Sequence, residues 1–171
     1  MLVKSIAEMV KIDQDLRFKC SRERRKLKEE EMSIYNYLIY IIDWVHNSRI
    51  KNIIRDNGYP SSKLIGRDGM DKFWLLIQHQ DYDLPLQKVC LRRCDFSRKN
   101  VAYLTDRIAI GEGKKQIYST QFSGKFDSKG NPIPKPIKNL SGLDKRRKWA
   151  GMEPFEQYMK QIKKLIGNRT K

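Results

Sequence analysis

The segment of residues 33–57 constrains the fold more than any other part of the chain. Its apolar residues recur with helical spacing along two neighbouring stripes. The stripes are Ile34, Leu38, Ile41 and Val45, and beside them Ile39, Ile42, Ile50 and Ile53. Because this apolar arc is wide, we expect the helix to lie centrally in the fold. Gly58 fits a helix C-terminus and Pro60 prevents the helix from continuing.

The rest of the chain also predicts helices, at residues 5–32, 68–81, 86–94 and 98–110 and again after residue 143. Between residues 114 and 137, β-prone residues, glycine and proline interrupt the helical pattern. The predicted fold class is mainly α, a single-domain helical bundle with a short extended or β-hairpin insert near residues 114–137. Residues 1–171 are expected to form this one domain, in which residues 21–32 form a charged helical extension.

Length and composition narrow the class of protein. A chain of 171 residues can bury a substantial core. It contains no uninterrupted apolar run of the roughly 18 residues that a membrane span needs, and its N-terminus lacks the apolar run of a signal peptide. The three cysteines, Cys20, Cys90 and Cys94, cannot all pair and form no C-x-x-C motif. We therefore expect a cytoplasmic protein with reduced thiols and no membrane partner.

The net charge of +16 is the strongest feature of the composition. It favours a polyanionic partner such as nucleic acid or an acidic protein, although a lysine-rich solvated surface also explains it. The sequence shows no zinc finger, RNP-type or helix-turn-helix signature. A non-enzymatic binding module is thus one hypothesis. It predicts one basic face, and loss of function when the basic residues of the segment 143–148, "LDKRRK", are replaced.

Four predicted helices each place an ionisable residue within their apolar stripe. These residues are Asp13, Asp43 with His46, His79, and Asp106. Burying an unpaired charge costs several kcal/mol at least, so such groups need one another, a metal or a ligand. Helical bundles build their sites in this way, from inward side chains on facing helices. The spacing therefore predicts a shared polar centre, and the alternative is that each group is only structural.

An acid–base enzyme is the first functional hypothesis for this centre. His79 would transfer protons, and Asp83 or Asp106 would orient it. The residues expected to bind the substrate are Arg107, Tyr118, Gln121, Asp13 and Arg17. With no P-loop, nucleophile elbow or GxGxxG motif, a hydrolase or group transferase on a small anionic or peptide-like ligand is favoured. Structural alternatives are an N-cap role for Asp83 and an ion pair of Asp106 with Arg107.

A metal-binding bundle protein is the second hypothesis. His79 and Asp83 lie four residues apart, and Asp43 and His46 lie three apart, so each pair shares a helical face. Histidine and carboxylate ligands at such spacings hold iron, manganese or zinc. The established di-metal pattern needs two Glu-x-x-His helices, which this sequence lacks. The sequence therefore specifies no cofactor, and it leaves the oligomeric state open.

Five segments, in the order in which they occur, resemble a bacterial domain family of unknown function, number 6624. They are "IDQDLR", "NGYPSSKLIG", "WLLIQHQDYDLPLQ", "VAYLTDRIAIGEGKKQIYSTQF" and "LDKRRKWAGMEPFEQYMK". The resemblance spans about residues 7–160 and implies one small soluble domain without an established activity. The motif residues that it implies for this chain are Asp13, Gln14, Arg17, His79, Asp83, Tyr103, Asp106, Arg107, Gln116, Tyr118 and Gln121. The unusually basic composition departs from the family.

Overall fold

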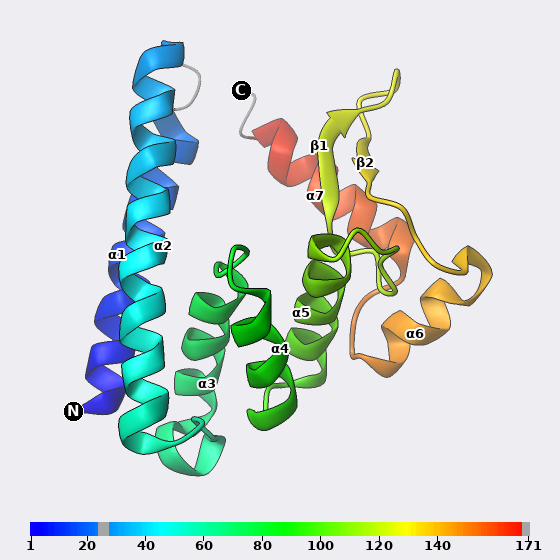
Figure 1. Cartoon of the computed structure of the whole chain (residues 1–171). Helices are drawn as coiled ribbons and strands as arrows, with labels where there is room; N and C mark the ends of the chain where they lie inside the picture. Colours follow the sequence, from blue (N-terminus) through cyan, green and yellow to red (C-terminus); the bar gives the residue numbers. More distant parts are fainter. Residues whose placement is uncertain (24–27, 169–171) are drawn as a thin grey trace. The chain divides into compact units, whose positions relative to one another are not determined.

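The computed structural model describes residues 1–23 and 28–168, and most of these residues are helical (Figure 1). The predicted mainly-α fold with one short hairpin is confirmed. The chain divides into two compact units, Met1–Phe96 and Ser97–Lys171. The expected single domain stays a prediction. None of the helices within the described residues is both long and apolar enough to cross a membrane.

Within its described residues the first unit contains four helices: α1 (Leu2–Glu23), α2 (Glu29–Asn57), α3 (Ser62–Gln78) and α4 (Leu84–Arg93). Helices α1 and α2 run antiparallel and side by side (Figure 1). Helix α1 packs against both α2 and α3, and α4 packs against α3. The faces of α1, α2 and α3 that meet in this way carry the polar residues singled out by the sequence.

The boundary between the first two helices differs from the sequence prediction. One helix over residues 5–32 was expected, but α1 ends at Glu23 and α2 begins at Glu29. The backbone N–H of Lys28 donates to the Glu31 carboxylate at 2.8 Å, which stabilises the start of α2. The expected charged extension, residues 21–32, therefore divides between the two helices, and its residues 24–27 lie outside the described residues.

The core of the first unit comes mainly from α1, α3 and the second half of α2. It includes Ile6, Met9, Ile50, Ile53, Met70, Phe73, Leu76, Ile77, Leu86 and Cys90. The expectation that α2 is central was wrong for its first half, because Ile34 and Leu38 are exposed there. The apolar arc of α2 is wider than the face that packs inside the unit. Gly58 ends the helix as predicted, with a φ of 73° that suits glycine.

The second unit combines helices with the hairpin. Its elements are α5 (Arg98–Gly111), β1 (Phe122–Phe126), β2 (Pro132–Pro134), the 3-10 helix η1 (Leu140–Gly142), α6 (Leu143–Trp149) and α7 (Phe155–Asn168). The strands are antiparallel and irregular in register between the pairs Phe122–Pro134 and Phe126–Pro132. Helix α7 packs against β2 and α6. Proline in both ends of β2 limits its pairing, which is why this hairpin stays short.

Candidate active site

The polar stretch after α3 is a packed turn that sets the position of His79, the residue that ends the helix. Two buried glutamine amides hold the turn. Gln80 Nε2 donates to the Leu76 carbonyl, and Gln87 Nε2 donates to the Ile77 carbonyl, both at 3.2 Å. Because these bonds satisfy carbonyls at the end of α3, the helix stops at a defined place and His79 is directed toward α1.

His79 meets Asp13 of α1. Its Nδ1 lies 3.1 Å from the Asp13 carboxylate, which is almost fully buried at 1% exposure. Gln14 Nε2 donates to the same carboxylate at 2.6 Å and Arg17 Nε at 2.8 Å. Three donors therefore surround a carboxylate that has lost its water, which is the arrangement a buried ionised carboxylate requires.

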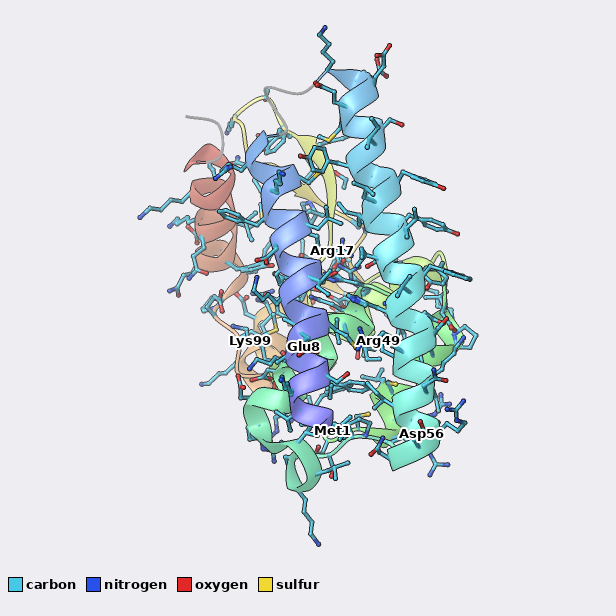
Figure 2. The ribbon with its side chains drawn as sticks, turned by 90° about the vertical axis from the view of Figure 1, so that its left-hand side faces the viewer. Met1, Glu8, Arg17, Arg49, Asp56 and Lys99 are labelled. Carbon is cyan, nitrogen blue, oxygen red and sulfur yellow. The ribbon has the colours of Figure 1, made fainter. Side chains whose placement is uncertain are left out.

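Arg17 joins this pair to α2. Its Nη2 donates to Asp43, so one guanidinium bridges the carboxylates of Asp13 and Asp43. Figure 2 shows Arg17 on the side of α1 that faces α2. Arginine suits this role because its planar fork of donors stays charged when partly buried. Asp13, Arg17, Asp43 and His79 thus form one cluster from three helices, here called the Asp–Arg–His cluster.

The two carboxylates of this cluster have pKa values displaced in opposite directions. Burial favours a higher pKa for Asp13, but hydrogen bonds and charge from His79 and Arg17 outweigh it and lower the pKa to about 2. Burial raises the pKa of Asp43 above its ordinary value, and Arg17 offsets this only in part. Carboxylates with such different environments are typical of sites that divide acid and base roles.

The charge of Asp13 fixes the tautomer of His79. An ionised carboxylate only accepts hydrogen bonds, so Nδ1 of His79 must carry the proton that is shared with Asp13. In the neutral ring, Nε2 then holds the lone pair. No residue within the described parts of the chain donates a hydrogen bond to that nitrogen. The geometry is that of a histidine held ready to accept a proton.

The other predicted residues of the first unit have different partners. Asp83 is the N-cap of α4, accepting from the Leu86 N–H at 3.0 Å, and it also pairs with Asn47 and Lys51. The cap role that the sequence offered as an alternative therefore describes Asp83. His46 is buried in α2, and burial lowers its pKa below the ordinary value, so it is neutral at pH 7.

Asp106 belongs to the second unit and has a dense set of partners there. Its carboxylate accepts from the backbone N–H groups of Ile117, Tyr118 and Thr120 at 2.6 to 3.1 Å, and from the Thr120 hydroxyl at 3.0 Å. It is fully buried. These bonds account for the charge without a ligand and support a structural role for Asp106 through backbone N–H groups, whereas its ion pair with Arg107 and its catalytic role both stay predictions.

Two arginines of α6 hold the opposite side of the same loop. Arg147, which is fully buried, donates to the carbonyls of Tyr118 at 2.7 Å and Glu153 at 2.8 Å. Arg146 donates to the Ile117 carbonyl at 2.9 Å. The loop therefore lies between a carboxylate that binds its N–H groups and guanidinium groups that bind its carbonyls. Opposite buried charges are compensated here through peptide dipoles rather than by direct contact.

The remaining predicted binding residues also lie in the second unit. The backbone of Tyr118 is held by Asp106 and Arg147, and burial raises the pKa of its hydroxyl. Gln121 exchanges hydrogen bonds with Gln116 through its N–H and its carbonyl, both at 2.9 Å. Arg107 is half-buried on α5. Asp13 and Arg17 alone of the predicted substrate-binding set are in the cluster with His79, and the roles of the others stay predictions.

The Asp–Arg–His cluster also has the composition of a metal site. One ligand atom each from Asp13, Asp43 and His79 lies within 4.8 Å of the other two. The pairs proposed from spacing, His79 with Asp83 and Asp43 with His46, are not the pairs that hydrogen bonds join. Arg17 now supplies the positive charge between the carboxylates, so a metal would compete with its guanidinium.

Sequence reasoning missed Gln80, Gln87 and Arg147, all of them fully buried. A signal was present for Arg147, because Leu143, Arg147 and Ala150 share one helical face of α6 and two of them are apolar. The basic run that surrounds Arg147 predicts a solvated face instead, and this outweighs the helical spacing. The glutamines carry no comparable signal, since a neutral amide is common on either side of a helix.

Comparison with known protein families identifies the family of the chain. A model of a family of unknown function (DUF6624) matches residues 2–171. The chain belongs to this family. No curated protein and no solved structure matches it. The resemblance noted from the five sequence segments is thereby confirmed, and it extends over almost the entire chain.

Proposed function

We propose that the first unit of this DUF6624 family member carries an acid–base catalytic centre with His79 as the general base. The observation that carries the proposal is the contact of His79 Nδ1 with the buried, ionised carboxylate of Asp13 at 3.1 Å. Asp13 would hold the tautomer and stabilise the imidazolium that forms when Nε2 accepts a proton. The reaction class that this supports is hydrolysis or group transfer on a small anionic or peptide-like ligand.

The chemical step needs no group beyond water or an acceptor hydroxyl. His79 Nε2 removes the proton as the oxygen forms its bond to the phosphorus or carbonyl carbon of the ligand. The bond to the leaving group then breaks, and the imidazolium returns the proton to it. Atoms and charge balance in this sequence, and Asp13 stays ionised throughout.

Arg17 is suited to bind the negative charge of such a ligand. It uses Nε and one N–H of Nη2 toward Asp13 and Asp43, and within the described residues its Nη1 has no hydrogen-bond partner. Its side chain remains 28% exposed, so a ligand can reach it. A guanidinium fixed on one side by two carboxylates presents its remaining donors in a defined direction, which favours phosphate or carboxylate recognition.

The experiment is a turnover screen with phosphoesters, thioesters and peptide amides, using the full chain and the variants His79→Ala and Asp13→Asn. Each of these two variants should lower turnover by about 100-fold or more, because the general base is lost or is no longer held by its carboxylate. Asp83→Ser is the matched control, because it removes a nearby carboxylate and retains an N-cap hydroxyl. Folded His79→Ala protein with unchanged turnover would show that the cluster is structural.

Nitrogen NMR of the imidazoles tests the geometry independently of any substrate. The chain has two histidines, so the spectrum contains the signals of two imidazole rings. The variant His46→Gln removes one set and thereby assigns the remaining signals to His79. We expect the neutral His79 ring to carry its proton on Nδ1 and to lose that preference in Asp13→Asn. A ring protonated on Nε2 in the wild-type protein would contradict the base role.

A metal site in the same cluster is a second candidate, and it rests on the three ligand atoms that lie within 4.8 Å of one another. Elemental analysis of the untagged protein tests it, with His79→Ala as the ligand variant. Arg17→Ala is the decisive addition, because removal of the competing cation should raise the affinity for added zinc or manganese. No metal in the wild-type protein and no gain in Arg17→Ala would exclude this candidate.

A further inference from the structure

Helix α2 carries an exposed apolar stripe outside the face that packs against α1. Ile34 and Trp44 are each 59% exposed and Tyr37 is 64% exposed, while Ile41 is half-buried. Together with the exposed Ser48, these residues follow a spacing of three, four, three and four. That spacing is the a/d pattern of a coiled coil, and it extends over two heptads. These five residues are here called the α2 stripe.

The stripe is distinct from the face that α2 uses inside its own unit. The buried residues of the helix are His46, Asn47, Ile50 and Ile53, and none of them belongs to the stripe. In Figure 2, side chains also project from α2 on the side away from α1. Large apolar residues gathered on one exposed face are uncommon on a monomer and indicate a binding surface.

The charges along α2 indicate which partner fits. The helix starts with Glu29, Glu30 and Glu31, and its second half carries the exposed cations Arg49, Lys51 and Arg55. Lys51 also pairs with Asp83 and Arg55 with Asp56, and both cations stay more than half exposed. Glu30 lies four residues before Ile34, and Arg55 lies seven after Ser48, so both continue the stripe. A second α2 that runs antiparallel would place the acidic end of each helix beside the basic end of the other. A parallel copy would place like charges together.

We propose that two copies of the chain associate through antiparallel pairing of their α2 stripes. The two-fold axis would pass between Ile41 and Trp44, so that Tyr37 packs near Ser48 of the partner and Glu30 faces Arg55. The stripe and its flanks would bury on the order of 1,000 Å² in total, which is the lower limit for a specific interface. The dimer should therefore be reversible and depend on concentration. This surface is independent of the proposed catalytic centre.

Sedimentation equilibrium of the full chain tests the association. The apparent mass should rise from that of one chain, 20.3 kDa, toward twice that value as the concentration increases. Trp44→Glu and Tyr37→Glu should each hold the protein at the mass of one chain. Phe126→Glu is the matched control, because Phe126 is 48% exposed on β1, and it should leave the association unchanged. A single-chain mass at all concentrations would overturn the proposal.

Charge reversal and cross-linking test the orientation. Glu30→Lys should weaken the dimer, and adding Arg55→Glu should restore it, because the pair is exchanged across the interface. Ile41→Cys lies near the axis and should cross-link under mild oxidation, whereas the two copies of Ser48→Cys lie too far apart in an antiparallel pair. The native cysteines are buried and should stay unreactive. Cross-linking through Ser48→Cys would show a parallel pair instead and contradict the inference.

Discussion

Asp13 is a residue whose pKa burial alone would raise. Its carboxylate is 1% exposed, yet its pKa is about 2 because His79 and Arg17 stabilise the charge more than burial disfavours it. The cluster thus stabilises a buried negative charge at a fixed position beside the imidazole of His79. At the residue scale, this is the feature that distinguishes the site from an ordinary helix contact.

The shift of Asp13 predicts a specific dependence of stability on pH. Because the folded pKa lies below the ordinary 3.8, the contribution is present above about pH 4 and is lost as the pH falls toward 2. A shift of this size corresponds to about 2 kcal/mol. Asp13→Asn should lower the free energy of unfolding at pH 7 by at least that amount and remove the slope in this window. Urea unfolding across pH 2 to 5 measures both.

Asp15→Asn is the control for this experiment. Asp15 lies on the same helix, is exposed and pairs with Lys11 on the surface, so its replacement should change stability by less than about 0.5 kcal/mol. If the slope between pH 4 and 2 persists in Asp13→Asn, other carboxylates govern acid unfolding, and His79 and Arg17 do not stabilise the charge of Asp13.

Periodicity identified residues of the cluster but not their pairings. Asp13, Asp43 and His79 each interrupt an apolar stripe, and that is visible in sequence because helical spacing is a local property. That His79 contacts Asp13 rather than Asp83 depends on how α3 lies against α1. The relative rotation of packed helices follows from side-chain packing across the chain, which spacing within one helix does not encode.

Helix α4 begins at a cap that the sequence offered as one of two roles for Asp83. Replacing Asp83 by alanine should cost about 1 kcal/mol, because the Leu86 N–H and the Asn47 amide lose their acceptor. Asp83→Ser should recover most of that loss while leaving no carboxylate. Thermal unfolding of the two variants separates the cap from any effect of charge. Equal destabilisation by alanine and serine would contradict the cap interpretation.

The loop between α5 and β1 is stabilised by the Asp106 carboxylate, and a single substitution can measure this contribution. Asp106→Asn exchanges one accepting oxygen for a donating amide beside backbone N–H groups, so buried donors lose their partner. We expect a loss of about 3 kcal/mol in the free energy of unfolding. Chemical denaturation measures it, and hydrogen exchange at Thr120 locates it.

Asp127 provides the matched comparison for Asp106. It accepts backbone N–H groups of Lys129 and Asn131 at 2.8 Å, but in an exposed turn. Asp127→Asn should therefore destabilise the protein much less than Asp106→Asn does, because water can satisfy the donors that are released. Similar losses for the two variants would show that the number of hydrogen bonds, and not the burial of the carboxylate, determines the loss in the free energy of unfolding.

Element boundaries show what a sequence pattern can and cannot supply. The end of α2 was predictable, since Gly58 adopts a left-handed φ that other residues avoid. The start of α2 was not, because residues 5–32 contain no glycine or proline to mark a break. The exposure of Ile34 and Leu38 was also unpredictable, because an apolar stripe looks the same whether a core or another molecule covers it.

At the scale of the whole molecule, the two units hold buried charges by different means. The first gathers side chains of opposite charge around Arg17, whereas the second separates Asp106 from Arg146 and Arg147 with a loop of backbone. The second arrangement uses two of the basic residues that had suggested a nucleic-acid surface. Only Lys145 and Lys148 of that segment's basic residues are exposed to solvent.

This assignment changes how a polyanion partner should be tested. Replacing Arg146 or Arg147 would disturb the loop, so loss of binding in such variants would have no clear meaning. The informative variant is Lys145→Glu with Lys148→Glu, and its matched control is Lys99→Glu with Lys115→Glu, since both pairs are exposed lysines of the second unit.

With a net charge of +16, we expect weak binding to single-stranded DNA that falls steeply with salt. Both double variants should weaken it equally, by less than about 10-fold, because a diffuse charge has no preferred contact. A fluorescence-anisotropy titration at several salt concentrations measures this. A much larger loss confined to Lys145→Glu with Lys148→Glu would instead locate a dedicated basic site on α6 and favour the binding-module hypothesis over the enzyme.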